Sequence, residues 1–106
     1  MKMNQSDIEY TVLKVLKDNP AITQRQLSKE LGLSLGKTNY VLHALIDKGL
    51  MKLSNFKRSD NKVGYLYLLT PAGIEETSIL AQTFLQIKSD QYNRLKKEIE
   101  ILKSEQ

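Results

Sequence analysis

Apolar residues recur at intervals of three and four along the first half of the chain, and this spacing predicts helices. A first helix is expected from about residue 7 to 18, with Ser6 and Glu9 as a capping box at its start. Asn19 and Pro20 end it, because proline disfavours helical backbone in the residue before it. We expect the apolar face of this helix to pack beneath the next two helices in a three-helix core.

Two further helices follow, and only a short joint separates them. One is predicted over residues 24–31 with Thr23 as its N-cap, and the other over residues 35–48 with Ser34 as its N-cap. Gly32 ends the first of the two, at the position after a helix where glycine is favoured. Two helices joined so closely cross at a steep angle, which is the geometry of a helix-turn-helix.

A β-hairpin is predicted directly after this pair of helices. Residues 50–56 and 63–69 have the composition of strands, and the second of them, VGYLYLL, is rich in β-branched and aromatic residues. The polar loop 57–62 between them centres on Asp60 and Asn61, which favour a turn. A hairpin at this place converts a helix-turn-helix into a winged one.

A long helix is predicted from Pro71 to the end of the chain, with Thr70 as its N-cap. Its roughly 35 residues would make a rod about 52 Å long, which a small domain cannot cover. A single helix needs a partner to stay formed in water, so we expect a homodimer, with a solvated tail beyond about residue 90 as the alternative. The candidate dimerisation residues, which follow coiled-coil spacing from Tyr92 onward, are Phe84, Ile87, Tyr92, Leu95, Ile99 and Leu102.

The expected fold is therefore mainly α with a small β-hairpin wing. It is a winged helix-turn-helix with a three-helix core, over residues 5–70, followed by a C-terminal helix for dimerisation over residues 71–106.

Positive charge is concentrated on the helix-turn-helix and the wing. The formal net charge of the chain is +4, but residues 23–63 hold eight Lys or Arg against three acids, and the remainder holds eight against nine. A solvated basic face would account for this charge alone. Its coincidence with a helix-turn-helix favours a surface that binds phosphates.

The outward face of the third predicted helix carries side chains suited to the major groove, which admits one helix. Asn39 can pair bidentately with adenine, and Lys37 can contact guanine or a phosphate. Tyr40 and His43 can donate to phosphates or pack on a thymine methyl, while Gly36 permits close approach of the backbone. An exposed face that binds nothing is the alternative. The candidate DNA-binding residues are Gln24, Arg25, Ser34, Gly36, Lys37, Asn39, Tyr40, His43, Lys57, Arg58 and Lys62.

Composition argues against other classes of protein. The chain of 106 residues has no Cys and one His, so we expect no disulfide and no metal site. No paired carboxylates, glycine-rich phosphate loop or nucleophile motif indicates an enzyme, and no cofactor is expected. No apolar run approaches the roughly 18 residues of a membrane span, and no signal peptide is visible, so we expect a cytoplasmic protein.

The segments ITQRQLSKELGLS, KTNYVLHALIDKGL and YLLTPAG, between Ile22 and Gly73, together resemble winged-helix regulators of the MarR type. The segments SLGKTNY, ALIDKG, NFKRSDNK and YLLTPAGIEE resemble, more narrowly, those of the small bacterial MarR-family regulators associated with exopolysaccharide gene clusters. The resemblance implies a transcription regulator that acts as a DNA-bound dimer, with residues 34–43 in the recognition helix. Typical MarR proteins are longer and carry an N-terminal helix that joins the C-terminal helices in dimerisation. Here we expect the C-terminal helix to dimerise alone, and a small-molecule effector stays open.

Two other functions are compatible with this fold. Winged helices also serve as protein-interaction modules, in which case the long C-terminal helix would be the binding surface. Some bind RNA by its shape. The combination of Lys37, Asn39, Tyr40 and His43 on one face favours binding of double-stranded DNA.

Overall fold

The structure is a computed structural model that describes residues 4–57 and 63–106. Within this part of the chain, four helices and one antiparallel hairpin form a winged helix-turn-helix with a long C-terminal helix, as predicted. The elements are α1 (Gln5–Asp18), α2 (Gln24–Leu31), α3 (Leu35–Asp47), β1 (Met51–Lys57), β2 (Val63–Leu69) and α4 (Pro71–Ser104).

Helix α1 begins earlier than its sequence suggested. The N-cap is Asn4, whose side chain accepts from the backbone N–H of Asp7 at 2.8 Å, while the Asp7 carboxylate accepts from the N–H of Asn4 at 3.2 Å. The predicted capping box of Ser6 and Glu9 is therefore wrong. The Asn4 pair has the same three-residue spacing, and it leaves Glu9 inside the helix, where this buried side chain forms an ion pair with Lys48.

The helix-turn-helix has the predicted caps. In α2 the Thr23 hydroxyl accepts from the N–H of Gln26 at 3.1 Å, and Gly32 adopts the left-handed conformation with φ 67° at the end of the helix. In α3 the Ser34 hydroxyl accepts from the N–H of Lys37 at 3.1 Å. These contacts fix the short joint and so set how α3 leaves α2.

The core lies between α1, α2 and α3, with contributions from the segment before α2 and from the hairpin. A hydrogen bond of 2.9 Å between the buried hydroxyls of Ser28 and Thr38 joins α2 to α3 inside it. The buried hydrophobic residues are Ile8, Val12, Leu13, Leu16, Ile22, Leu27, Leu31, Val41, Leu42, Leu45, Met51 and Tyr67. The predicted three-helix core is confirmed.

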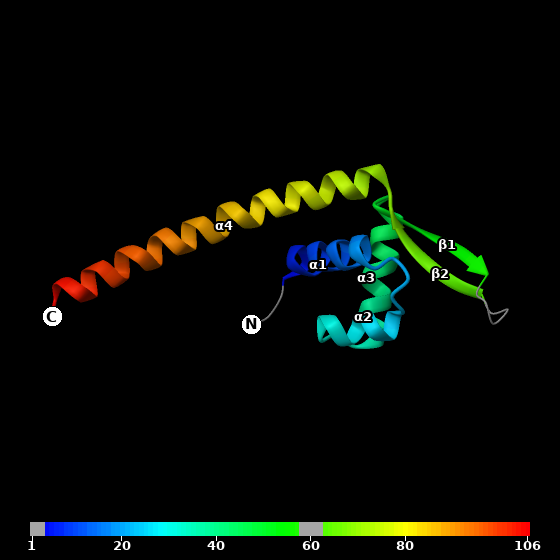
Figure 1. Ribbon diagram of the computed structural model, residues 1–106, viewed down its shortest axis with the longest axis horizontal. Coiled ribbons are helices and arrows are strands. Elements are labelled where there is room, and N and C mark those ends of the chain that lie inside the picture. The colour runs from blue at the N-terminus through cyan, green and yellow to red at the C-terminus, as the bar shows by residue number, and fades with distance from the viewer. Residues whose placement is uncertain (1–3, 58–62) are drawn as a thin grey trace.

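The hairpin pairs Met51 with Leu69 at its base and Lys57 with Val63 at its far end. On the face toward the helices, Met51 and Tyr67 are buried, but Leu53, which pairs with Tyr67, is 47% exposed. The hairpin therefore leaves the domain after its first few residues and projects as a wing (Figure 1). A backbone hydrogen bond of 2.9 Å from Tyr67 N–H to Pro20 C=O ties β2 to the segment before α2.

Helix α4 starts at a close contact between its first turn and the end of α3. The Thr70 hydroxyl accepts from the N–H of Gly73 at 3.0 Å and donates to the carbonyl of Gly49 at 2.6 Å. A side chain on Gly73 would place its Cβ 1.9 Å from the carbonyl oxygen of Leu50. Only glycine permits this approach.

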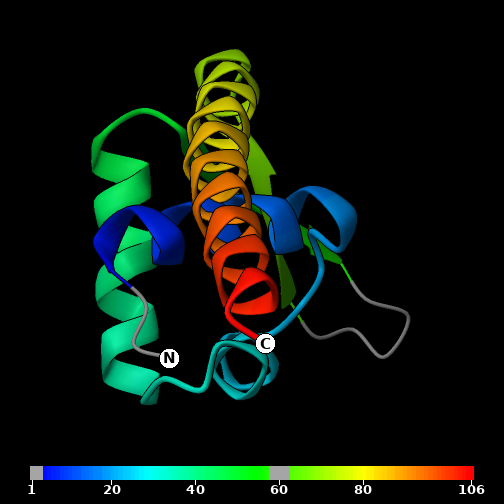
Figure 2. The ribbon, with the colours of Figure 1, turned by 90° about the vertical axis from the view of Figure 1, so that its left-hand side faces the viewer.

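The second half of α4 extends far beyond the domain, which makes the molecule 68 Å long and 26 by 23 Å across. In Figure 1, α1 lies beneath the first half of α4, where the rings of Tyr10 and Phe84 meet edge to face at 5.3 Å. Figure 2 looks along α4 from its C-terminal end and shows α1 crossing beneath it. Among the described elements, none lies beside the second half.

Candidate nucleic-acid interface

Helix α3 has two faces of opposite character. Thr38, Val41, Leu42 and Leu45 are buried against the core. The predicted contact residues Gly36, Lys37, Asn39, Tyr40 and His43 are all exposed, and so is the N-cap Ser34. The structure therefore brings six of the candidate residues together on one helix, with their side chains free of the core.

Lys37 and Tyr40 lie one turn apart and contact each other. The Lys37 ammonium sits 5.3 Å from the centre of the Tyr40 ring, within the range of a cation–π attraction. Tyr40 is 64% exposed, so its ring holds the ammonium at the surface rather than drawing it into the core. The pair presents a positive charge over the first two turns of α3, beside the positive end of the helix dipole.

Gln24 lies in a hydrogen-bonded cluster that its sequence did not suggest. Its side-chain nitrogen donates at 3.2 Å to the amide oxygen of Asn39 on α3, and at 3.2 Å to the hydroxyl of Tyr67 on β2. No periodic pattern relates residues 24, 39 and 67, which meet only because α3 packs against α2 and β2 is bonded to the segment before α2. Gln24 was predicted to contact the DNA backbone, and in the structure its side-chain nitrogen donates to two groups of the protein itself.

Of the remaining candidates, Arg25 and Lys57 lie on described elements. Arg25 is exposed on α2, and so is Lys29, which was not among the candidates. Lys57 is the last residue of β1. We also predicted DNA contacts by Arg58, by Lys62 and by the side chain of Lys57. These predictions lie outside the part of the chain that the structure describes.

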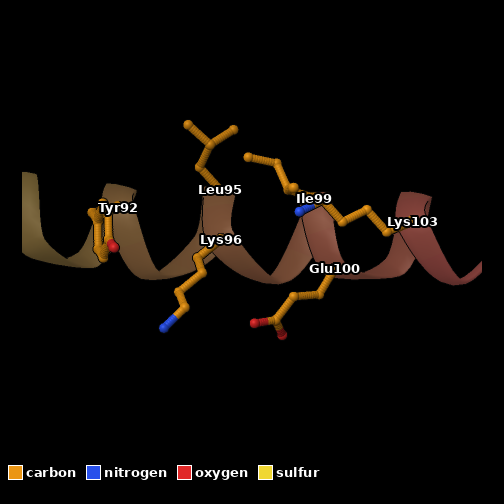
Figure 3. Close-up of a pocket in the computed structure, with 6 residues that line it drawn as sticks. All are labelled: Tyr92, Leu95, Lys96, Ile99, Glu100 and Lys103. Carbon is orange, nitrogen blue, oxygen red and sulfur yellow. The ribbon is translucent and has the colours of Figure 1, made fainter.

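The candidate dimerisation residues lie along α4, and their environments differ. Phe84 is half-buried against Tyr10 of its own chain. Ile87 is exposed. The four candidate residues that follow it along α4 are exposed as well, and we call these four the seam: Tyr92, Leu95, Ile99 and Leu102. A shallow pocket lined by Tyr92, Leu95, Lys96, Ile99, Glu100 and Lys103 runs along one side of the seam. Figure 3 shows Leu95 and Ile99 projecting to one side of the helix and Lys96 and Glu100 to another.

The seam continues the face by which α4 packs on its own domain. Leu95 follows Thr77, and Leu102 follows Phe84, by 18 residues, which is about five whole turns at 3.6 residues per turn. Thr77 is buried and Phe84 is half-buried. One side of α4 is therefore covered by the domain in its first half and uncovered in its second half.

A family model described as winged helix-turn-helix DNA-binding matches residues 5–51, from α1 to the start of β1. These residues form the three helices of the winged helix-turn-helix, and the hairpin wing follows them. No curated protein sequence matches the chain significantly. None of the described helices of this winged-helix protein is both long and apolar enough to cross a membrane.

Solved structures of MarR-family regulators share the fold. MarR from Staphylococcus aureus, in complex with salicylate and kanamycin, matches at TM-score 0.63 and 17% identity, over 81% of this chain and 56% of that chain. A MarR mutant from E. coli complexed with operator DNA matches at TM-score 0.55 and 27% identity, over 70% and 51%. A MepR mutant from S. aureus bound to an oligodeoxyribonucleotide matches at TM-score 0.61 and 17% identity, over 94% and 79%. The winged-helix protein thus spans just over half the length of the two MarR chains.

Proposed function

We propose that this winged-helix protein is a transcription regulator, and not an enzyme, that binds specific sequences in double-stranded DNA as a homodimer. The observation that carries the proposal is the outward face of α3. Lys37, Asn39, Tyr40 and His43 are exposed together there, with no acid before Asp47. A solvent-facing helix has no need of this set, whereas a recognition helix needs donors and acceptors that reach base edges and phosphates.

In the proposed complex α3 enters the major groove through its N-terminal half. The backbone N–H groups at the start of α3 and the Ser34 hydroxyl face one phosphate strand, and Arg25 at the start of α2 faces the flanking backbone. The wing, residues 57–63, reaches the adjacent groove or its phosphates. The E. coli MarR mutant complexed with operator DNA, at 27% identity, supports this use of the fold.

The homodimer is proposed to form through the seam of α4. Its four large side chains lie in 3-4-3 spacing and are each at least 44% exposed, so we expect the same apolar face of α4 in a second copy of the chain to cover them. A partner helix that ran parallel along the whole face would meet α1, which already covers the first half. An antiparallel partner would cover only the seam and place the two domains at opposite ends of the helix pair.

The target genes belong to the same proposal. The segments SLGKTNY and YLLTPAGIEE resemble regulators associated with exopolysaccharide gene clusters, so such a cluster is the proposed target. The exposed seam also favours a second candidate function, a protein-interaction module in which α4 binds a different protein and the basic face of α3 is incidental.

A mobility-shift titration tests the proposal, with the duplex upstream of the protein's own gene and a scrambled duplex as competitor. We expect a Kd of about 10⁻⁸ M for the specific duplex, and a steep loss of affinity as salt is raised. Equal affinity for both duplexes would contradict the proposal. If, in addition, alanine at Lys37, Asn39, Tyr40 and His43 left function in the cell intact while Leu95→Asp abolished it, the interaction module would be favoured.

A further inference from the structure

The side-chain amide of Gln24 has both of its N–H groups engaged. They donate to the amide oxygen of Asn39 and to the hydroxyl of Tyr67, each at 3.2 Å. Only the Gln24 oxygen, an acceptor, is left. Phosphate oxygens are acceptors too, so the side chain of Gln24 has no free donor for the DNA backbone.

Gln24 is held at both ends. Its backbone is the first residue of α2, directly after the cap at Thr23. At the other end, the Tyr67 side chain is 7% exposed, and its backbone N–H donates to Pro20 at 2.9 Å. The position of the Gln24 amide is therefore set by the fold rather than by solvent.

The contact to Gln24 gives the Asn39 amide one orientation. The Asn39 amide oxygen is turned toward α2. The amide nitrogen of Asn39 is the second polar atom of this side chain, which lies on the exposed face of α3. A carbonyl oxygen has two lone pairs, so one remains after the bond from Gln24. Adenine in the major groove offers N7 as an acceptor and N6 as a donor, and an asparagine matches both only when its oxygen and nitrogen lie in the right order.

We propose that Gln24 is a positioning residue that fixes this order, so that Asn39 meets an adenine without first having to turn. The inference rests on the proposed function and deepens it. The side chain of Gln24 sets the base preference of Asn39 and does not itself donate to DNA. Tyr67 extends the chain of contacts from the wing to the recognition helix.

The test uses Gln24→Glu, which keeps the shape of the side chain and removes both donors. Its carboxylate accepts from the nitrogen of Asn39, which turns the amide over and presents the oxygen to DNA. An acid in the first turn of a helix is also favourable, so loss of fold is not expected. The matched control is Gln26→Glu, which adds the same charge two residues later, at a capping-box position that takes Glu as well as Gln.

The probe is a pool of duplexes with a randomised centre, from which the wild-type protein selects its site. Single base-pair changes in that site then measure preference. We expect Asn39→Ala to lose about five- to 100-fold of preference at one adenine. Gln24→Glu should lose most of the same preference at the same base pair, and the double variant no more than Asn39→Ala. Gln26→Glu should weaken binding to all duplexes and keep the preference. A Gln24→Glu variant with wild-type preference overturns the inference.

Nuclear magnetic resonance of the free protein decides the point without DNA. The side-chain NH₂ of Asn39 should be ordered in the wild type, should shift in Gln24→Glu, and should stay unchanged in Gln26→Glu. An Asn39 amide as mobile as an ordinary exposed asparagine overturns the inference even if the protein binds DNA. If the pool yields no selected site, the proposed function fails, and this measurement still tests the contact between Gln24 and Asn39.

Discussion

At the residue scale, Gly73 and Gly36 are both helical, but an added methyl group would meet different surroundings. At Gly73 the Cβ would lie 1.9 Å from the carbonyl oxygen of Leu50, and at Gly36 it would meet nothing within 4 Å. The same substitution to alanine should therefore have opposite effects at the two positions.

Gly73→Ala should lower the free energy of unfolding by about 3 kcal/mol, because the backbone of Leu50 has to move and the contact between the start of α4 and Gly49 has to open. Urea unfolding followed by circular dichroism measures this loss. A variant as stable as the wild type would mean that α4 does not approach Leu50 so closely.

Gly36→Ala should raise the free energy of unfolding by up to about 1 kcal/mol, because alanine favours a helix and nothing obstructs it. The same methyl group would stand between the start of α3 and the DNA backbone, so affinity for the selected duplex should fall about fivefold or more. Unfolding and mobility-shift titrations on one preparation separate the two effects. Unchanged affinity would place Gly36 outside the contact.

At the element scale, one ion pair joins the end of α3 to α1. Lys48 follows the last residue of α3 and bonds to Glu9, whose side chain is only 12% exposed. Without Lys48 the Glu9 carboxylate would lose its ion-pair partner at a nearly buried position. This pair therefore helps to hold α3 at a fixed angle on the core.

Lys48→Ala should cost about 1–2 kcal/mol of unfolding free energy, since it leaves a nearly buried carboxylate without its partner. Lys52→Ala is the control, because Lys52 is exposed on β1, and its replacement should change stability by less than about 0.5 kcal/mol. Thermal unfolding of the two variants in parallel measures the difference. Equal effects would show that the pair contributes nothing.

The sequence predicted the elements because each carries its own local signals. The N-caps of α2, α3 and α4 are the predicted residues Thr23, Ser34 and Thr70, and Gly32 ends α2 as predicted. The start predicted for α1 was wrong because Asn4 and Ser6 both qualify as N-caps by residue type. Glu9, the predicted capping-box partner of Ser6, is instead buried and paired with Lys48, a tertiary contact that local sequence does not reveal. The role of Gln24 could not be predicted, because tertiary packing alone brings its partners near: α3 packs against α2 and supplies Asn39, and β2 supplies Tyr67.

At the scale of the whole molecule, α4 carries an apolar face longer than the domain that covers it. Leu95 and Ile101 test which side of the second half matters. Both are more than half exposed, at 56% and 58%, on the same helix. Leu95 belongs to the seam, and Ile101 does not.

Leu95→Asp should shift the protein from dimer to monomer at micromolar concentration, because it places a charge at the centre of the proposed seam. Ile101→Asp should leave the dimer intact. Sedimentation measures both, and circular dichroism should show a native α1–α3 domain in each. Loss of the dimer in neither variant, or in both equally, would contradict pairing through the seam.

Because the α4 face is continuous from Thr77 to Leu102, the length of this helix fixes both the distance of the seam from the domain and the direction in which the seam faces. Each residue inserted near its middle would lengthen it by about 1.5 Å, and would also turn the seam by about 100° relative to the domain. In the proposed dimer, the spacing between two DNA half-sites could then not change one residue at a time. Only steps close to whole turns, such as about seven or 18 residues, would lengthen the reach and still keep both recognition helices on the same side of the DNA.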